Sequence, residues 1–198
     1  MLLTSYQTEF VEAGCDEAGR GCLAGPVFAA AVILPTDFKN DILTDSKKLN
    51  RTQREKLRTI IEKEAIAFSV ASLDNVKIDE VNILQASIQS MHLALDGLKK
   101  KFGFIAVDGN KFNAYKNTPH KTIVQGDGKY LNIAAASVLA KTYRDEWMER
   151  AHEQYLIYGW LQNKGYGTAA HRQAIMQHGY SPLHRKSFVL KEIQTKLW

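Results

Sequence analysis

Residues 10–34, FVEAGCDEAGRGCLAGPVFAAAVIL, decide the fold, because two apolar runs in this stretch enclose an acidic pair and a glycine-rich turn. The run over residues 27–34 is continuous, rich in Ala and Val, and flanked by prolines, which predicts a strand buried on both faces. Residues 10–15 are predicted to form the neighbouring strand. The glycines between the two runs allow a sharp turn and a close approach of the backbone to a ligand. We therefore predict a hairpin through the core that carries Asp16, Glu17 and Arg20.

The acidic pair indicates a cation site at the end of the first strand. Carboxylates are costly to desolvate, so a chain that places Asp16 and Glu17 at the end of a central strand usually supplies a cation or water. A divalent metal ion is the simplest candidate. Taken alone, the pair also fits a plain turn in which the aspartate bonds nearby backbone groups. The rest of the chain has to decide between the two interpretations.

Length and composition indicate one compact globular domain. The chain has 198 residues, of which 45% are hydrophobic and 24% charged. These values are ordinary for a folded domain with a sizeable core. No apolar run is long enough to span a bilayer, and residues 1–10 lack the features of a secretory signal, so we expect a cytoplasmic protein. A net charge of +5 mildly favours a polyanionic partner.

The cysteines and histidines do not predict a zinc site or a nucleophile. Cys15 and Cys22 are the only cysteines. They are too few for a disulfide framework or a structural zinc site, so we expect reduced core residues. The six histidines show no close ligand spacing. We interpret His171, His178 and His184 as structural or phosphate-facing rather than catalytic.

Beyond the hairpin, the apolar pattern predicts alternating helices and strands. Helical spacing predicts helices over residues 51–65, 79–101 and 131–158, and a shorter one that ends at His178. The last residues, 181–198, begin as a basic loop and end in a helix-like stretch. Short apolar runs predict strands over residues 67–73, 103–107 and 120–125.

Two further aspartates follow predicted strands. Asp108 and Asp127 each stand beside glycine at the carboxyl end of a strand, where α/β sheets present ligands. Each Asp-Gly pair on its own also fits an ordinary turn. Together with Asp16 and Glu17 they would form an all-oxygen site, which prefers Mg²⁺ or Mn²⁺ to zinc. Two such ions about 4 Å apart would activate a water and stabilise the leaving oxygen during in-line displacement at phosphorus.

Other polar residues suit a phosphate chain. Arg20 and the backbone amides of its glycine neighbours would hold a phosphate or bond a hydroxyl. Lys47, which precedes the first helix, would extend the phosphate track. Tyr166 lies in a glycine-flanked loop and would stack on a sugar or base, although a packed tyrosine is the simpler interpretation without the metal site. Ser137 suits either close helix packing or a phosphate contact.

These residues match the ordered motifs of a known family. On these motifs the chain closely resembles prokaryotic ribonuclease HII over nearly its whole length. The resemblance implies a ribonuclease H-like α/β fold with a mixed central β-sheet flanked by helices. It also implies a single catalytic domain over residues 1–198, whose part from about residue 160 is a helical C-terminal extension. The motifs are DEAGRG (16–21), DSKKL (45–49), DG (108–109), GDGKY (126–130) with IAAAS (133–137), and KGYGT (164–168).

The resemblance also implies an activity. The enzyme would cleave the RNA strand of RNA/DNA hybrids and single ribonucleotides embedded in duplex DNA, by two-metal-ion hydrolysis with Mg²⁺ or Mn²⁺. Cleavage on the 5′ side of the ribonucleotide would leave 3′-hydroxyl and 5′-phosphate ends. This activity implies a role in ribonucleotide removal during DNA replication and repair. We expect a monomer whose partners are RNA/DNA hybrid and ribonucleotide-containing duplex DNA.

The resemblance further implies a role for each candidate site residue. An acidic quartet would bind the catalytic ions, a glycine loop would read the ribose 2′-hydroxyl, and a tyrosine would stack at the following deoxyribonucleotide. The quartet is Asp16, Glu17, Asp108 and Asp127; the loop residues are Gly19, Arg20 and Gly21; the tyrosine is Tyr166; and Lys47 and Ser137 would contact phosphate.

Three positions differ from the family pattern. Cys22 stands where Pro is common, Gly128 where a small residue such as Ala is common, and Asn132 where Ser is common. None of these differences removes a carboxylate. Gly128 follows Asp127 directly, so it bears on the placement of that carboxylate rather than on its role.

Two alternatives from other classes remain open. The first is a non-catalytic nucleic-acid binding module with the same fold. Four acidic residues argue against it, because carboxylates in a phosphate groove weaken binding unless metal ions neutralise them. The second is a glycosidase with a carboxylate pair, which would leave two aspartates, Arg20 and the lysines without a role.

Overall fold

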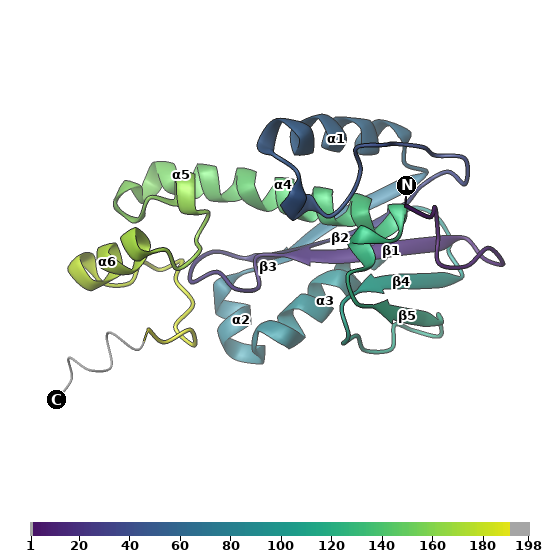
Figure 1. The fold of residues 1–198 in the computed structure, drawn as a ribbon. Coiled ribbons are helices and arrows are strands. Elements are labelled where there is room, and N and C mark those ends of the chain that lie inside the picture. Colours follow the sequence, from purple (N-terminus) through teal and green to yellow (C-terminus); the bar gives the residue numbers. More distant parts are fainter. Residues whose placement is uncertain (1, 191–198) are drawn as a thin grey trace.

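The computed structural model describes residues 2–190, which form a mixed five-stranded sheet in the order β3-β2-β1-β4-β5. β1 is the middle strand, antiparallel to β2 and parallel to β4. β3 runs antiparallel to β2, and β5 runs parallel to β4. The mixed α/β fold expected from the sequence is confirmed (Figure 1). The strands are β1 (Glu12–Ala18), β2 (Val27–Ile33), β3 (Ala67–Leu73), β4 (Phe104–Asp108) and β5 (His120–Ile123).

The acidic pair lies inside β1 rather than in the turn that follows it. The sequence predicted a strand over residues 10–15, whereas the pairing with β2 continues to Ala18. Asp16 stands opposite Ala30, and Glu17 stands opposite Ala29. Directly opposite side chains in an antiparallel pair are close neighbours, so the small alanines leave room beside the carboxylates. The ladder therefore persists through the acidic pair.

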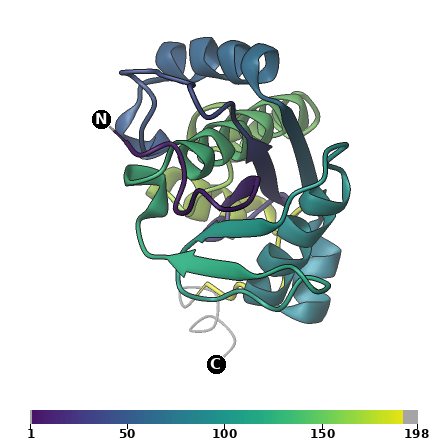
Figure 2. The same ribbon diagram turned by 90° about the vertical axis from the view of Figure 1, so that its right-hand side faces the viewer.

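Helices cover both faces of the sheet (Figure 2). α1 (Arg51–Glu64) and α4 (Leu131–Gln154) lie on one face, and α3 (Ile83–Asp96) lies on the other. Alternate residues of β2 point into the two cores, and all of them are buried. None of the helices in residues 2–190 is long and apolar enough to cross a membrane.

The predicted helix over residues 79–101 is wrong, because two helices occupy this part of the chain. α2 (Asn75–Val81) and α3 are separated by Asn82, which has a φ of 67°. The Asn82 side chain accepts a hydrogen bond from the Gln85 amide at 3.1 Å and so caps α3. Asparagine tolerates this backbone conformation and competes for backbone donors, which ends one helix and starts the next.

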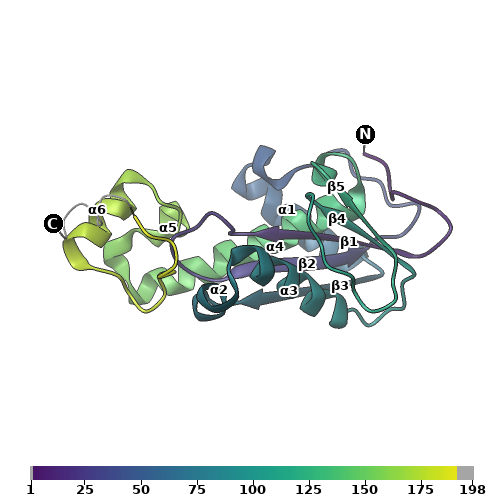
Figure 3. The ribbon, with the colours of Figure 1, turned by 90° about the horizontal axis from the view of Figure 1, so that it is seen from below.

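The C-terminal part lies beyond the end of the sheet, beside the far end of α4 (Figure 3). It contains α5 (Trp160–Asn163) and α6 (Ala169–His178), of which the sequence predicted only the second. The helix-like stretch expected at the very end of the chain lies outside the described residues. Three short 3-10 helices complete the elements within residues 2–190: η1 (Ser46–Lys48), η2 (Gly126–Gly128) and η3 (Leu156–Tyr158).

The close contact between β1 and α4 gives a first prediction. A Cβ atom on Gly14 would lie 2.3 Å from the backbone carbon of Asn132. Gly14→Ala should therefore lower the free energy of unfolding by about 2 kcal/mol or more, because the backbones of a central strand and a long helix would have to separate. Thermal and urea unfolding measure this loss.

Gly128→Ala is the matched control. A Cβ atom there meets no heavy atom within 4 Å, so the substitution should leave stability within about 1 kcal/mol of the starting protein. Equal unfolding midpoints for the two variants would contradict the close packing of Gly14 against α4.

Candidate active site

The predicted site residues, apart from Asp127, gather around one cavity at the carboxyl ends of β1 and β4. Asp127 lies beside it, next to Lys47. Parallel neighbours end at the same edge of a sheet, so the end of β1 and Asp108 at the end of β4 lie side by side. The cavity has a volume of about 450 Å³. Its lining is Asp16, Glu17, Ala18, Gly19, Arg20, Gly21, Ser46, Lys47, Asp108, Ser137, Lys141 and Tyr166.

Asp16 and Asp127 are the most deeply buried members of the acidic quartet, each with 4% of its surface exposed. Burial raises the pKa of Asp16 well above its usual value, and repulsion from Glu17 and Asp108 raises it further. A hydrogen bond with the Ser137 hydroxyl opposes this rise. Burial also raises the pKa of Glu17, against the opposing effect of Arg20, whose Nη1 lies 3.1 Å from Glu17 Oε1. The carboxylates thus favour a neighbouring cation.

Asp108 fixes the turn that presents Asp127. Asp108 Oδ1 accepts a hydrogen bond of 2.7 Å from the Gly126 amide, which joins the end of β4 to η2. β5 ends at Ile123, two residues earlier than predicted, because Gln125 takes a left-handed conformation with a φ of 56°. Asp127 therefore lies in η2. Burial and repulsion from Asp108 raise the pKa of Asp127 to about 6.

Lys47 places a positive charge beside Asp127. Its Nζ lies 4.0 Å from a carboxylate oxygen of Asp127 and 4.0 Å from one of Asp45. Asp45 also caps η1 by accepting the Lys47 amide at 2.9 Å. Desolvation lowers the pKa of Lys47, but the charges of the nearby aspartates raise it overall. Lys47 thus partly neutralises the acidic quartet.

Ser137 lies against the acidic quartet at the cavity wall. It is 3% exposed, and its hydroxyl oxygen lies 2.9 Å from that of Ser46. Because Ser137 also bonds Asp16, it links η1 to the central carboxylate. The sequence analysis did not identify Ser46 or Lys141 as cavity residues. The signal for Lys141 was its place one helical turn after Ser137, which puts both residues on one face of α4.

The glycine loop, residues 19–25, joins β1 to β2 and bears Arg20 beside the acidic residues. Gly19 has a φ of 96°, and a Cβ atom there would lie 2.0 Å from Arg144 Nε. Arg144 is 1% exposed and donates from its guanidinium to the carbonyls of Ala24, Pro26 and Lys164. The sequence analysis missed this residue, because nothing in the helical pattern of α4 separates a buried arginine from a solvated one.

Tyr166 faces the cavity from the C-terminal part. Its side chain is partly exposed, and its ring centre lies 5.9 Å from Lys141 Nζ and 5.9 Å from the Arg144 guanidinium carbon. Cys22 pairs with Tyr166 in an antiparallel bridge, and both cysteines of the chain are buried and free, as predicted. The structure therefore brings Tyr166 to the same cavity as Arg20 from a distant part of the chain.

The other two departures from the family pattern lie outside the cavity lining. Asn132 is buried between β1 and β2, where its Oδ1 accepts the Leu34 amide at 2.9 Å and its Nδ2 donates to the Glu12 carbonyl. Gly128 ends η2, next to Asp127. Asn132 therefore serves the packing of α4 on the sheet.

The donor set fits a hard divalent cation, since four buried or partly buried carboxylates supply only oxygen. The pKa values of Asp16, Glu17 and Asp127 are raised by burial and, to a lesser extent, by repulsion from neighbouring carboxylates, and a bound cation would offset both effects. Within residues 2–190, no three His, Cys, Asp or Glu side chains already stand close enough together to hold a metal ion. Ligation would therefore require the carboxylates to turn toward a common point.

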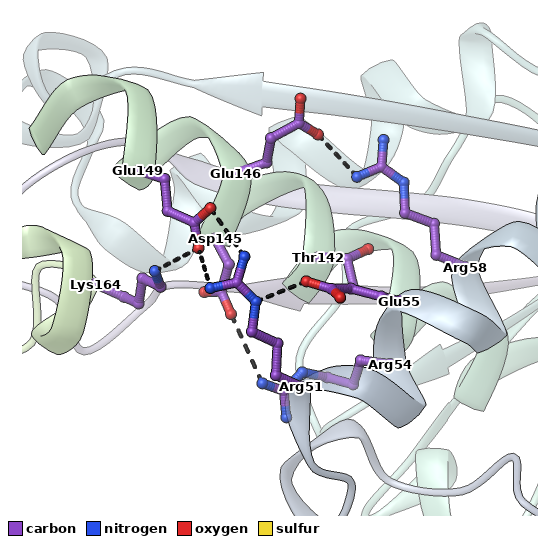
Figure 4. Close-up of a pocket in the computed structure, with 9 residues that line it drawn as sticks. All are labelled: Arg51, Arg54, Glu55, Arg58, Thr142, Asp145, Glu146, Glu149 and Lys164. Carbon is purple, nitrogen blue, oxygen red and sulfur yellow. Dashed lines mark hydrogen bonds and ion pairs between the residues drawn. The ribbon is translucent and has the colours of Figure 1, made fainter. Parts of the chain in front are cut away.

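A second cavity, of about 220 Å³, lies between α1 and α4 (Figure 4). Its arginines and lysine are paired with carboxylates: Arg51 with Glu55 and Glu149, Arg58 with Glu146, and Lys164 with Glu149. We interpret it as an ion-pair network that joins the two helices. Arg54 extends this network to the active site, because it donates to the carbonyls of Ser46 and Leu49 on either side of Lys47.

This fold is similar to that of solved ribonucleases H. The chain matches the ribonuclease H2 from Pyrococcus horikoshii OT3 with a TM-score of 0.77 and 25% identity, over 93% of this chain and 97% of that one. It matches the fold of Bst-RNase HIII in complex with Mn²⁺ with a TM-score of 0.71 and 18% identity, over 94% of this chain and 69% of that one. The fold and the acidic cavity thus define a ribonuclease H-like α/β enzyme.

The sequence comparisons narrow this class to one family. The family model of Ribonuclease HII matches residues 13–191. The Ribonuclease HII of Bacteroides thetaiotaomicron is 57% identical over 190 residues, which cover 96% of this chain and 95% of that protein. The chain belongs to the ribonuclease HII family, as its motifs predicted. It is therefore an enzyme that cleaves the RNA strand of RNA/DNA hybrids.

The raised pKa of Asp127 predicts a pH-dependent gain in stability when its charge is removed. A carboxyl whose pKa rises on folding destabilises the folded state as the pH rises through that pKa, because the unfolded chain releases the proton more easily. With a folded pKa of about 6, Asp127→Asn should add about 1–3 kcal/mol of stability near pH 8 in chelator and little near pH 4. Thermal unfolding at the two pH values measures the difference.

Asp96→Asn is a control of opposite sign. Hydrogen bonds from Lys116 and Tyr115 lower the pKa of Asp96, so its carboxylate contributes stability that is present at high pH and lost on acidification. This variant should be destabilised near pH 8. If Asp127→Asn were destabilised there as well, the contact with Lys47 would outweigh the burial of the Asp127 charge.

Proposed function

We propose that this enzyme is a metal-dependent endoribonuclease that also cleaves at single ribonucleotides embedded in duplex DNA. Cleavage falls on the 5′ side of the ribonucleotide and leaves 3′-hydroxyl and 5′-phosphate ends. Such a reaction would serve the removal of ribonucleotides from DNA during replication and repair. The observation that supports this proposal most is the gathering of three acidic residues, Arg20 and Tyr166 around one cavity, with Asp127 beside it.

The proposed metal ligands are Asp16, Glu17, Asp108 and Asp127. Two divalent ions, Mg²⁺ or Mn²⁺, would activate the attacking water and stabilise the leaving oxygen when bound. The Mn²⁺ complex of the fold neighbour Bst-RNase HIII supports a divalent ion. In this chain the Ser137 hydroxyl orients the central carboxylate, and β1, β4 and η2 hold the ligands on separate elements.

Lys47 and Ser137 are proposed to contact the phosphate chain as well. The Lys47 side chain is 80% exposed, so its ammonium can leave Asp127 and follow a phosphate once metal ions neutralise the carboxylates. Ser137 has less freedom because it is buried against Ser46. A phosphate would therefore have to enter the cavity to contact the Ser137 hydroxyl, which cannot move outward to meet it.

Recognition of the ribonucleotide is assigned to the glycine loop and to Tyr166. The Arg20 side chain bonds Glu17, a proposed metal ligand, so the loop that bears Arg20 would lie near the phosphate to be cleaved and the neighbouring ribose. A Cβ atom on Gly21 would meet no heavy atom within 4 Å, so the loop backbone is open to a 2′-hydroxyl at this residue, whereas the missing side chain of Gly19 lets the loop pack on Arg144. The exposed ring of Tyr166 would stack on the following deoxyribonucleotide.

We also propose a monomer that works as one catalytic domain over residues 1–198, with the part from about residue 160 as a helical C-terminal extension. α4 supports this view, because its first half packs on the sheet and its second half packs on the C-terminal part. The extension would then complete the substrate site rather than act alone.

The cleavage reaction is tested on a labelled DNA duplex with one ribonucleotide, incubated with Mg²⁺, Mn²⁺ or chelator, with an all-DNA duplex as control. We expect metal-dependent cutting 5′ to the ribonucleotide. Asp16→Asn and Asp108→Asn should reduce the rate by about 10³-fold or more while duplex binding persists, because each removes a ligand of the reacting ions. Folded protein that binds the duplex but cuts with neither ion would favour the non-catalytic binding module.

Junction recognition is tested by Arg20→Ala and Tyr166→Ala. Each should lower cleavage at a single ribonucleotide by about 10-fold or more relative to a continuous RNA/DNA hybrid. Tyr166→Ala removes a stacking ring, which contributes about 1–3 kcal/mol, and Arg20→Ala removes the side-chain bond to Glu17 that holds the glycine loop beside the carboxylates. The measurement is kcat/KM on both substrates. Arg150→Ala, an exposed arginine of α4 outside the cavity, is the matched control, and equal losses on both substrates would contradict the proposed roles.

A further inference from the structure

We propose that a short tie segment, residues 181–185, positions the glycine loop against Tyr166 and thereby sets how strongly the enzyme prefers a ribonucleotide junction. Its positioning residues are His184 and Arg185. The inference rests on the proposed function, because it concerns the residues assigned above to junction recognition. It assigns no contact between the tie segment and the substrate.

The tie segment and the Tyr166 loop pair with the same part of the glycine loop. The Leu23 amide donates to the Gly165 carbonyl at 2.8 Å. The Gly25 amide donates to the Leu183 carbonyl at 2.9 Å, and the Arg185 amide donates to the Leu23 carbonyl at 2.8 Å. Three segments far apart in the sequence therefore form one hydrogen-bonded unit at the edge of the cavity, where the tail after α6 runs back to the β1–β2 connection (Figure 1).

Arg185 holds the backbone of the glycine loop with a fully buried guanidinium. Its Nε donates to the Gly25 carbonyl at 3.0 Å, and its Nη1 donates to the Arg20 carbonyl at 2.9 Å. Its Nη2 is buried without a hydrogen-bond partner among the described residues. Burial lowers the pKa of Arg185 to about 10, so the group remains charged at neutral pH. Burying a charged guanidinium with one nitrogen unpaired within residues 2–190 costs folding free energy. We therefore interpret Arg185 as a residue that fixes the Arg20 backbone rather than one that mainly stabilises the fold.

We call the glycine loop and Tyr166 together the junction site. His184 acts on the Tyr166 side of this site, through His171. Trp160 Nε1–H donates to His171 Nε2 at 3.0 Å, so the His171 proton is on Nδ1, which donates to the Tyr166 carbonyl at 2.9 Å. The Ser181 amide donates to His184 Nδ1 at 2.9 Å, which leaves the His184 proton on Nε2. His184 Nε2 lies 3.1 Å from His171 Nε2, so its proton shares the lone pair of His171 Nε2 with the Trp160 N–H. Both rings are neutral, consistent with the burial that lowers the pKa of each.

Two adjacent residues thus reach the two halves of the junction site. Arg185 bonds the Arg20 carbonyl directly, and His184 reaches the Tyr166 carbonyl through one intervening ring. A reaction that depends on the spacing between a 2′-hydroxyl contact and a stacking ring is sensitive to displacements of about 1 Å, which can reduce rates by about 10²-fold. The tie segment holds that spacing.

Arg185→Met tests the proposal, because it keeps an unbranched side chain as far as the position of Nε and removes the donors to the Gly25 and Arg20 carbonyls. We expect kcat/KM on the single-ribonucleotide duplex to fall about 10-fold or more relative to the continuous hybrid, with Arg185→Lys in between. Ile61→Ala, a buried substitution on α1 away from the cavity, should lower the melting temperature and leave the ratio unchanged. An unchanged ratio in folded Arg185→Met would overturn the inference.

A readout that is independent of activity is the ¹⁵N NMR of the imidazole rings. We expect His171 to carry its proton on Nδ1 and His184 on Nε2, with both rings neutral near pH 7. Any other protonation pattern would overturn the relay from His184 to Tyr166. If the starting protein did not cut the single-ribonucleotide duplex at all, the proposed function would fail, while the NMR result would still decide whether the relay exists.

Discussion

The burial of a carboxylate in the central strand is the constraint on which the rest of the structure depends. Asp16 lies in β1 between two packed faces, where an ionised group is costly unless nearby groups compensate it. The small residues opposite it on β2, the Ser137 hydroxyl on α4 and the ammonium of Lys47 all serve this need. A sheet without an acidic centre could use larger residues at these positions, and α4 would not have to lie so close.

The sequence alone predicted those elements whose bounds are set by residues close together in the chain. The bounds of β3 and α1 followed from apolar runs and spacing, and the family model confirms the family that the motifs indicated. The roles of the acidic quartet and the glycine loop stay predictions. The break at Asn82 was missed because one asparagine inside a helical pattern is a weak signal until its φ is known. The end of β1 was misplaced because charged residues in a central strand contradict the usual pattern of burial.

The roles of Arg144 and Arg185 could not have been predicted from the sequence. Arginine is mostly a surface residue, and most partners of these two side chains are backbone carbonyls more than 100 residues away in the chain. Carbonyl acceptors leave no trace in the sequence, because every residue has one. The same holds for the ring relay through His171, since the partners that make His184 structural become visible only when α5, α6 and the tail are folded together.

The pairing of the glycine loop with residues 165 and 183–185 has a consequence for the order in which the enzyme matures. β1 and β2 are neighbours in the sequence and can pair as soon as both have left the ribosome. The loop between them, however, takes its final hydrogen bonds from segments made some 140–160 residues later, so it closes only when these slow, long-range contacts form. A nascent chain therefore carries its sheet and its acidic centre well before it can select a substrate.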